Sequence, residues 1–247
     1  MRSIIVVSLI IFLTAFSFRT DFLTEQKKYE RVRASMNEKE AIILERLNDA
    51  GLNVDNFDIL IVAFKAERML EIYAKNKSAT TYKKLIVYDI CSSSGQLGPK
   101  RQSGDYQVPE GFYYIDRFNP NSNFYLSLGL NYPNQSDRIK SKAASLGGDI
   151  FIHGSCVTVG CMPMTNDKIK EIYLYALYAR NNGQSKIPVY VFPFQMTDRN
   201  FKAYKEAYKS SPVLINFWTN LKRGYDLFTK DKKRLTIGFE KDGDYKY

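Results

Sequence analysis

The only histidine of this 247-residue chain, His153, lies eight positions before a cysteine, Cys161. An imidazole within reach of a thiol can remove its proton, and the thiolate that forms is a strong nucleophile. Gly160 frees the backbone just before Cys161, so the amides of both residues could donate hydrogen bonds to a developing oxyanion. These residue types in this order predict a cysteine nucleophile, Cys161, with His153 as its general base.

A structural role for both side chains is the alternative, because cysteines are commonly small buried residues and a lone histidine often only satisfies local hydrogen bonds. The neighbouring elements favour chemistry. An apolar strand, residues 149–153, ends at the histidine, and Thr165 or Asn166 can cap a helix that follows. We therefore expect Cys161 within one turn of a helix N-terminus, where the helix dipole and a nearby imidazolium would favour the thiolate.

The segment that starts at His153 resembles the active-site motif of the YkuD-type L,D-transpeptidases, and most closely that of their YafK-like branch. The branch carries the pattern HGxCx(S/T)xGCxxMT, which this chain matches at His153, Gly154, Cys156, Thr158, Gly160, Cys161, Met164 and Thr165. Further blocks similar to the family follow in collinear order within residues 58–196. They are residues 64–71, 94–100, 104–113, 119–122, 127–134 and 187–194.

The resemblance implies an α+β fold that is mostly β, with an active-site helix and a helical C-terminal appendage. It also implies cysteine acyl transfer on peptidoglycan stem peptides, in which Cys161 attacks a carbonyl next to a diaminopimelate residue and forms a thioester. His153 would be the base, the Gly154 carbonyl would orient the imidazole, and the amides of Gly160 and Cys161 would hold the oxyanion. No metal or other cofactor is implied.

The acceptor of the acyl group is left open by the sequence. The YafK-like resemblance implies water as the acceptor, and thus hydrolysis of the linkage between peptidoglycan and an attached lipoprotein. An amine acceptor would instead give transpeptidation, which forms crosslinks or attaches protein to the wall. Two further alternatives are a non-catalytic wall-binding module, which would need neither His153 nor Cys161, and a cysteine protease of unrelated fold, which would not explain the collinear blocks.

Two features differ from family members outside the YafK-like branch. Val159 stands where those members carry a second histidine, and Met162 and Pro163 stand where an arginine helps to hold the substrate. The mode of substrate binding is therefore open. Candidate substrate contacts are Lys100, Arg101 and Arg138, which could meet carboxylates, together with Tyr132 and Asn134; surface or turn roles are the alternative for each.

Hydrophobic patterning divides the chain into four parts. Residues 1–17 have a positive start and an apolar run too short to span a bilayer, which predicts a secretory signal peptide. Residues 18–57 are expected to form a charged helical lead-in, residues 58–196 the catalytic domain, and residues 197–247 a helical C-terminal extension. Expected strands are residues 59–64, 69–73, 84–88, 112–116, 124–130, 149–153 and 188–194.

Export places the protein in the periplasm or cell envelope, and an uncleaved N-terminal segment would add membrane association. Three cysteines leave one thiol unpaired, so Cys91 and Cys156 are available for a disulfide while Cys161 stays free. The alternatives are that both thiols are buried and reduced, or that a Cys156–Cys161 bridge forms and inactivates the nucleophile.

The net charge of +10 is compatible with contact to anionic envelope polymers or lipid head groups, or with a basic surface that only faces solvent. No nucleic-acid-binding motif accompanies the charge.

Overall fold

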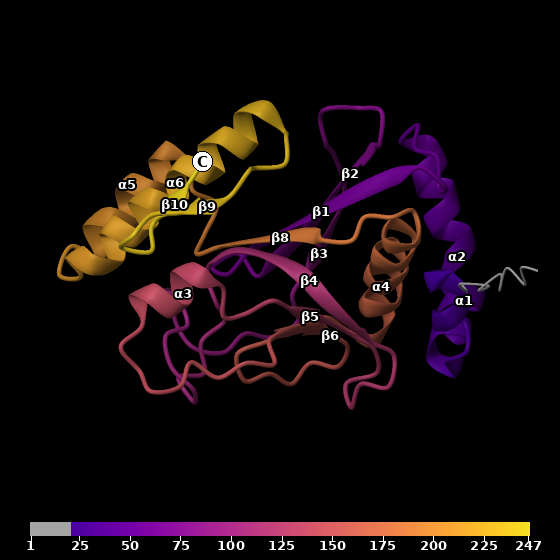
Figure 1. Cartoon of the computed structure of the whole chain (residues 1–247), viewed down its shortest axis with the longest axis horizontal. Coiled ribbons are helices and arrows are strands. Elements are labelled where there is room, and N and C mark those ends of the chain that lie inside the picture. The colour runs from indigo at the N-terminus through magenta and orange to yellow at the C-terminus, as the bar shows by residue number, and fades with distance from the viewer. Residues whose placement is uncertain (1–20) are drawn as a thin grey trace, which may run out of the picture.

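An eight-stranded mixed sheet forms the centre of the computed structural model, which describes residues 21–247 (Figure 1). The predicted signal peptide lies outside the described residues. The strands occur in the order β3-β2-β1-β8-β4-β5-β6-β7, and all neighbours are antiparallel except β1–β8 and β6–β7. They are β1 (Phe57–Phe64), β2 (Met69–Asn76), β3 (Lys83–Asp89), β4 (Gly111–Asn119), β5 (Ser127–Leu130), β6 (Phe151–His153), β7 (Met162–Pro163) and β8 (Ile187–Phe192).

The central strands are apolar on both faces, as expected of strands covered on both sides. Because side chains alternate along a strand, β1 divides its residues between two cores. Ile59, Ile61 and Ala63 belong to one hydrophobic cluster. Leu60, Val62 and Phe64 belong to the other. The sheet therefore separates two layers of helices.

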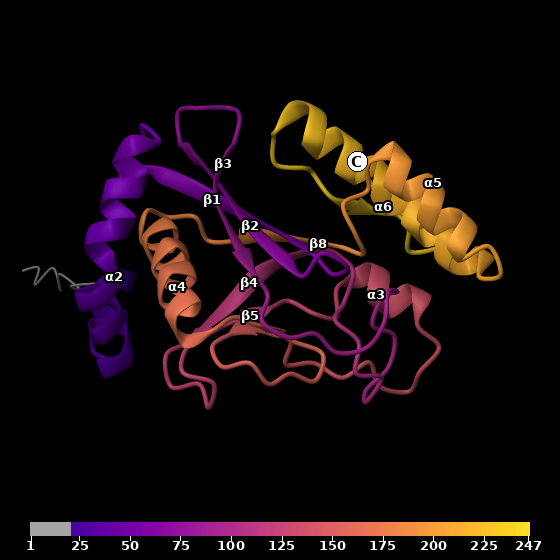
Figure 2. The same cartoon turned by 180° about the vertical axis from the view of Figure 1, so that it is seen from behind.

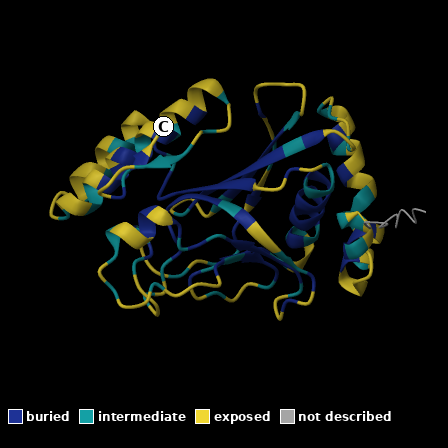
Figure 3. Cartoon of the chain, in the orientation of Figure 1, coloured by how far each residue is buried: buried dark blue, intermediate teal, exposed yellow. Residues whose placement is uncertain are grey.

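Helices α1 (Phe22–Gln26), α2 (Glu30–Asp49) and α4 (Asn166–Asn181) cover the first face, with α4 packed between α2 and the sheet (Figures 1 and 2). The Thr165 side chain caps α4 by accepting a hydrogen bond from the Lys168 amide. Much of α4 is buried, which Figure 3 shows as a blue helix inside the more exposed α2. This is the helix expected after the cysteine.

The opposite face is covered by α5 (Asp198–Ala207), α6 (Pro212–Asp231) and a hairpin of β9 (Gly238–Phe239) and β10 (Tyr245–Lys246). Its core is strongly aromatic, and Trp218 of α6 is packed edge-on against Phe194 at a centroid distance of 5.3 Å. A short helix, α3 (Gln135–Lys140), lies beside this layer and begins at a capping box formed by Asn134 and Asp137. Among residues 21–247, no helix combines the length and apolar character that crossing a bilayer requires.

The predicted α+β fold, with a mostly β core, an active-site helix and a helical C-terminal extension, is confirmed, although several element bounds differ. Within the expected helical lead-in, the long helix α2 begins at Glu30 and ends at Asp49. The expected strand at residues 124–130 begins only at Ser127, because Tyr125 has a φ of +74°, outside the β region. Pairing of β4 with β5 extends β4 to Asn119.

One buried carboxylate joins the C-terminal helical layer to the sheet. The Glu110 side chain is fully buried, and its Oε1 accepts hydrogen bonds from Lys65 Nζ at 2.9 Å and from the Gly98 amide at 2.6 Å. Its Oε2 accepts a hydrogen bond from Trp218 Nε1 at 2.9 Å. Lys65 Nζ also donates to the carbonyls of Gly98 and Val108, so both buried charges have their hydrogen-bonding capacity used.

Replacing Glu110 should therefore be costly. We expect Glu110→Ala to lower the free energy of unfolding by about 3–5 kcal/mol, because the substitution leaves the buried Lys65 ammonium without its counter-charge. Denaturant unfolding measures this value. Glu206→Ala is the matched control, because Glu206 pairs with Lys209 at an exposed site, and it should cost less than about 1 kcal/mol. Equal small losses in both variants would contradict the assigned role of Glu110.

Candidate active site

The register of β6 and β7 places His153 and Cys161 on the same face of the sheet. The two strands are parallel, with Ile152 opposite Met162 and His153 opposite Pro163. Continuing that register by one residue sets Cys161 opposite Phe151, and residues two apart on a strand point to the same side. The histidine and the cysteine are therefore displaced by two residues along the strand, about 6.6 Å of rise.

The His153 side chain is 1% exposed and is held in one tautomer. Its Nδ1 lies 2.6 Å from the Gly154 carbonyl oxygen, and because a carbonyl can only accept, Nδ1 carries the proton. Nε2 is then the unprotonated nitrogen. Burial lowers the pKa of His153 below its ordinary value of 6.5, against an opposing effect of the hydrogen bond to Gly154. The imidazole is thus neutral at neutral pH and can accept a proton at Nε2.

The Cys161 thiol is also neutral in this arrangement. Burial raises the pKa of Cys161 above its ordinary value of 9.0, and the negative charge of Asp149 raises it further. The hydrogen bond from the Phe151 amide and the positive charge of Lys100 lower this pKa, but their effect is smaller. The Sγ atom accepts from the Phe151 amide at 3.4 Å and lies 3.5 Å from the Asp149 carbonyl oxygen. Within the described residues, no hydrogen bond joins this thiol to the imidazole.

The expectation that a helix N-terminus and an imidazolium favour a thiolate at Cys161 is wrong for this structure. Residues 162–163 form β7, and α4 begins only at Asn166, so Cys161 lies outside the first helical turn. Beside the strand pair the thiol is half-buried, and this partial burial disfavours its charged form. The resting pair is therefore a thiol and a neutral imidazole.

Both amides expected to hold the oxyanion already have partners. The Gly160 amide donates to Ser94 Oγ at 2.7 Å, and the Cys161 amide donates to Thr158 Oγ1 at 3.0 Å. Gly160 has a φ of +88°, and a Cβ there would lie 3.1 Å from the Gln107 carbonyl oxygen, so the position suits glycine alone. A substrate oxyanion that used both amides would have to displace both hydroxyls.

Ser94 was not singled out in the sequence, although it opens one of the blocks similar to the family. It lies in the wall of a cavity of about 260 Å³ that Cys161 also lines. Arg68, in the β1–β2 turn, lines the same cavity and has no ion-pair partner among residues 21–247. Its guanidinium is therefore available to a substrate carboxylate. The remaining walls are Ala63, Lys65, Ala66, Ile90, Ser92, Ser93, Gly95, Gln96, Leu97, Val108 and Met162.

The five candidate substrate contacts lie elsewhere, and none of these described residues lines the Cys161 cavity. Lys100 Nζ is buried and bonds Asp105 at 2.6 Å, while Arg101 pairs with Asp137 at 2.7 Å. The remaining three all line a separate cleft, where Tyr132 donates to backbone carbonyls, Asn134 caps α3 and Arg138 is exposed. Lys100 still acts on the thiol through its charge.

Cys91 and Cys156 form a disulfide, and Cys161 is the free cysteine. Cys91 follows β3, and its amide donates to the Pro163 carbonyl of β7 at 3.0 Å. The hydrogen bond and the disulfide together bring the two ends of the strand order into contact and curl the sheet. Cys156 lies in the loop between His153 and Cys161, so the disulfide also fixes the loop that carries the Gly160 amide.

Comparison with known proteins gives the class. Residues 58–215 match the model of the YkuD family, described as the L,D-transpeptidase catalytic domain. The chain is 39% identical over 181 residues to the candidate L,D-transpeptidase YafK of Escherichia coli K12, a match that covers 72% of this chain and 70% of YafK. The chain therefore belongs to the YkuD family of L,D-transpeptidases, a family that acts on peptidoglycan.

Solved structures show a weaker likeness. The cell-shape-determining protein Pgp2 of Campylobacter jejuni has a TM-score of 0.44 and 18% identity, covering 76% of this chain and 74% of Pgp2. Bd1075 of Bdellovibrio bacteriovorus has a TM-score of 0.41 and 18% identity, covering 74% of this chain and 75% of Bd1075.

Loss of the disulfide should loosen the fold. We expect Cys91→Ser with Cys156→Ser to lower the free energy of unfolding by about 2–4 kcal/mol, because the bridge no longer restricts the unfolded chain. The bridged residues are 65 positions apart. Thermal unfolding of both proteins, with and without reductant, measures the effect. Reductant should destabilise only the wild-type protein; an equal response of the variant would show that the bridge does not form.

Alkylation of Cys161 should report its raised pKa. The rate with iodoacetamide should keep rising with pH up to and beyond pH 9, because the reactive thiolate is present only above the raised pKa. Mass spectrometry of the cysteine-containing peptides gives the rate at each pH. Cys161→Ser is the control and should not react. A rate that reaches its plateau below pH 8 would instead indicate a stabilised thiolate.

Proposed function

We propose that this protein is a cysteine-dependent enzyme that hydrolyses the linkage between peptidoglycan and an attached lipoprotein at a diaminopimelate-linked bond. Cys161 is the nucleophile and His153 the general base. The observation that carries the proposal is the His153 side chain: its hydrogen bond to Gly154 fixes the proton on Nδ1, leaving Nε2 as a base on the sheet face that also bears the free thiol. Membership of the YkuD family supports the reaction class.

The reaction starts from a neutral pair. Cys161 Sγ forms a bond to the carbonyl carbon while its proton passes to His153 Nε2, which produces an oxyanion and an imidazolium. The carbon–nitrogen bond then breaks, and the imidazolium returns the proton to the leaving amine. Water attacks the thioester with His153 again accepting a proton, and the carboxylic acid and the thiol are released. The lowered pKa of His153 keeps the base unprotonated for the first step.

Substrate entry would rearrange the hydrogen bonds of the cavity. The oxyanion would replace Ser94 Oγ on the Gly160 amide and Thr158 Oγ1 on the Cys161 amide. These two amides suit an oxyanion because one belongs to the nucleophilic residue itself and the other to the residue before it. Arg68 would meet a carboxylate of the stem peptide at the cavity wall. In this account Lys100 and Arg101 serve internal ion pairs, and Tyr132 and Asn134 line a different cleft, so none of the four contacts the substrate at Cys161.

We also propose that residues 1–17 direct export and that residues 18–57, 58–196 and 197–247 are the lead-in, catalytic domain and C-terminal extension. The disulfide supports export, because such bonds form and persist in oxidising compartments such as the periplasm. Retention of residues 1–17 would add a membrane anchor to the exported protein.

Purified sacculi with and without attached lipoprotein provide the test. We expect the protein to release the lipoprotein remnant, detected by mass spectrometry of muropeptides, and Cys161→Ala to reduce the rate by at least about 10³-fold because the nucleophile is lost. His153→Ala should have a similar effect. New crosslinks or exchanged amino acids would instead identify transpeptidation, and no change in either preparation would identify a wall-binding module.

A further inference from the structure

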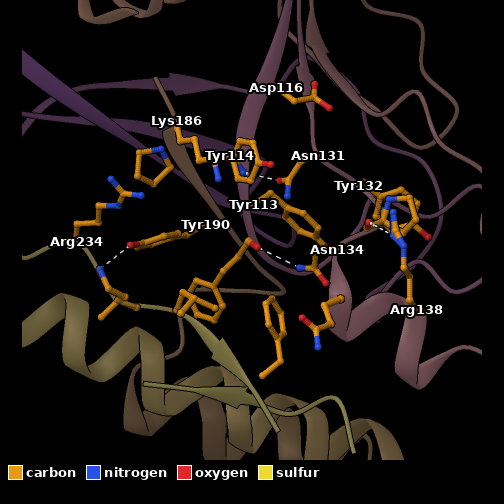
Figure 4. A pocket seen from close by; sticks show the side chains of 17 residues that line it. Tyr113, Tyr114, Asp116, Asn131, Tyr132, Asn134, Arg138, Lys186, Tyr190 and Arg234 are labelled. Carbon is orange, nitrogen blue, oxygen red and sulfur yellow. Dashed lines mark hydrogen bonds between the residues drawn. The ribbon is translucent and has the colours of Figure 1, made fainter. Parts of the chain in front are cut away.

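A second cleft, of about 610 Å³, lies between the sheet and the segment that follows α6 (Figure 4). Its floor includes Phe112 of β4 and Tyr190 of β8, which belong to the aromatic core beneath the C-terminal helices. The Cys161 cavity is instead bordered by Val108 and Met162 of the other core. The two cavities have no lining residue in common, so the cleft is separate from the cavity that holds the thiol.

The C-terminal extension completes the cleft. Arg234, Leu235, Ile237 and Phe239 form the wall that faces the sheet. The Leu235 amide donates to the Tyr190 hydroxyl at 2.9 Å, which fixes this wall on β8. Most of this extension lies beyond residue 215, where the family match ends. The cleft is thus a joint product of the sheet and the extension.

Three cations line the cleft without a carboxylate partner in the described part of the chain. Arg138 donates only to the Pro133 carbonyl, at 2.9 Å, and Lys186 Nζ lies 4.9 Å from the centre of the Tyr114 ring. Arg234 is exposed. In Figure 4, Arg234 and Arg138 lie at opposite ends of the view, with Lys186 and Tyr114 between them.

The other polar groups of the cleft add donors. Asn131 Oδ1 accepts from the Tyr114 amide at 2.7 Å, which leaves the Asn131 NH₂ group free to donate. The Tyr190 hydroxyl accepts from Leu235, and burial raises the pKa of Tyr190 to about 12, so its proton is retained. Asp116 is the acidic residue among those that line the cleft, and its carboxylate lies 3.8 Å from the Arg117 guanidinium.

We propose that this cleft binds an acidic peptide through at least two of its carboxylates. A volume of 610 Å³ is typical of a site for a small ligand or a few peptide residues. Cations at both ends suit carboxylates that are separated along an extended chain, and the free NH₂ group of Asn131 suits a carbonyl or carboxylate oxygen between them. Guanidinium groups bind carboxylates in a bidentate manner.

Two other anionic classes fit less well. A lipid surface would require a patch of exposed apolar side chains at the rim, but none of the large hydrophobic residues exposed in the described chain lines the cleft. Single-stranded nucleic acid requires open aromatic faces for stacking. Here the Tyr114 ring is already covered by Lys186, and Tyr113, Tyr132 and Tyr190 are buried.

Calorimetric titration of the full chain carrying Cys161→Ala, which excludes turnover, tests the proposal. The probes are an α-linked Glu-Ala-Glu-Ala peptide, the stem tetrapeptide L-alanyl-γ-D-glutamyl-diaminopimelyl-D-alanine, and a neutral Gln-Ala-Gln-Ala peptide. We expect saturable binding of at least one acidic probe that weakens as salt is added, and no binding of the neutral peptide. The tighter acidic probe identifies the source of the ligand.

Charge reversal locates the site. Lys186→Glu with Arg234→Glu should weaken binding of the acidic probe by at least 10-fold, since both groups line the cleft. Lys202→Glu with Lys205→Glu makes the same change in net charge on exposed positions of α5 and should weaken it less than 2-fold. Thermal unfolding establishes that both variants fold. Absence of binding by both acidic probes, or equal weakening in the two variants, would overturn the proposal, whatever the outcome with sacculi.

Discussion

The packing of the C-terminal helices on the sheet depends on the hydrogen bonds of one buried carboxylate, that of Glu110. It binds Lys65 at the end of β1, the Gly98 amide in the chain that continues from the cavity wall, and Trp218 of α6. A buried charge is tolerated only when its partners are fixed, so these three segments are held in one geometry. The cavity on one face and the C-terminal helices on the other are thereby parts of one packed unit.

The second constraint is the short parallel pairing of β6 with β7. It brings a half-buried thiol and a buried imidazole to one face, and burial favours the neutral form of each. A neutral pair is less reactive toward stray electrophiles and oxidants than a thiolate, because the thiolate is the nucleophilic form. In the proposed reaction, proton transfer from Cys161 to His153 is coupled to attack on a bound carbonyl.

Much of the fold could be predicted from the sequence because its signals are local. Apolar runs predicted the strands, Thr165 predicted the start of α4, and the motif around His153 and Cys161 indicated the family. The electrostatics of the thiol could not be predicted, since they depend on two strand residues after Cys161 and on burial by distant segments. Ser94 and Arg68 were missed for the same reason, because only the folded sheet brings them to the cavity. The basic residues at 100 and 101 instead serve internal ion pairs.

Acid-quenched peptide mapping by mass spectrometry, during turnover of lipoprotein-linked muropeptides, tests the central claim that Cys161 carries the acyl group. The account predicts an acyl adduct on the peptide that contains Cys161, absent from Cys161→Ala, and complete loss of product after Cys161 is alkylated. Product formation that continues at the original rate with Cys161 fully alkylated would contradict the account.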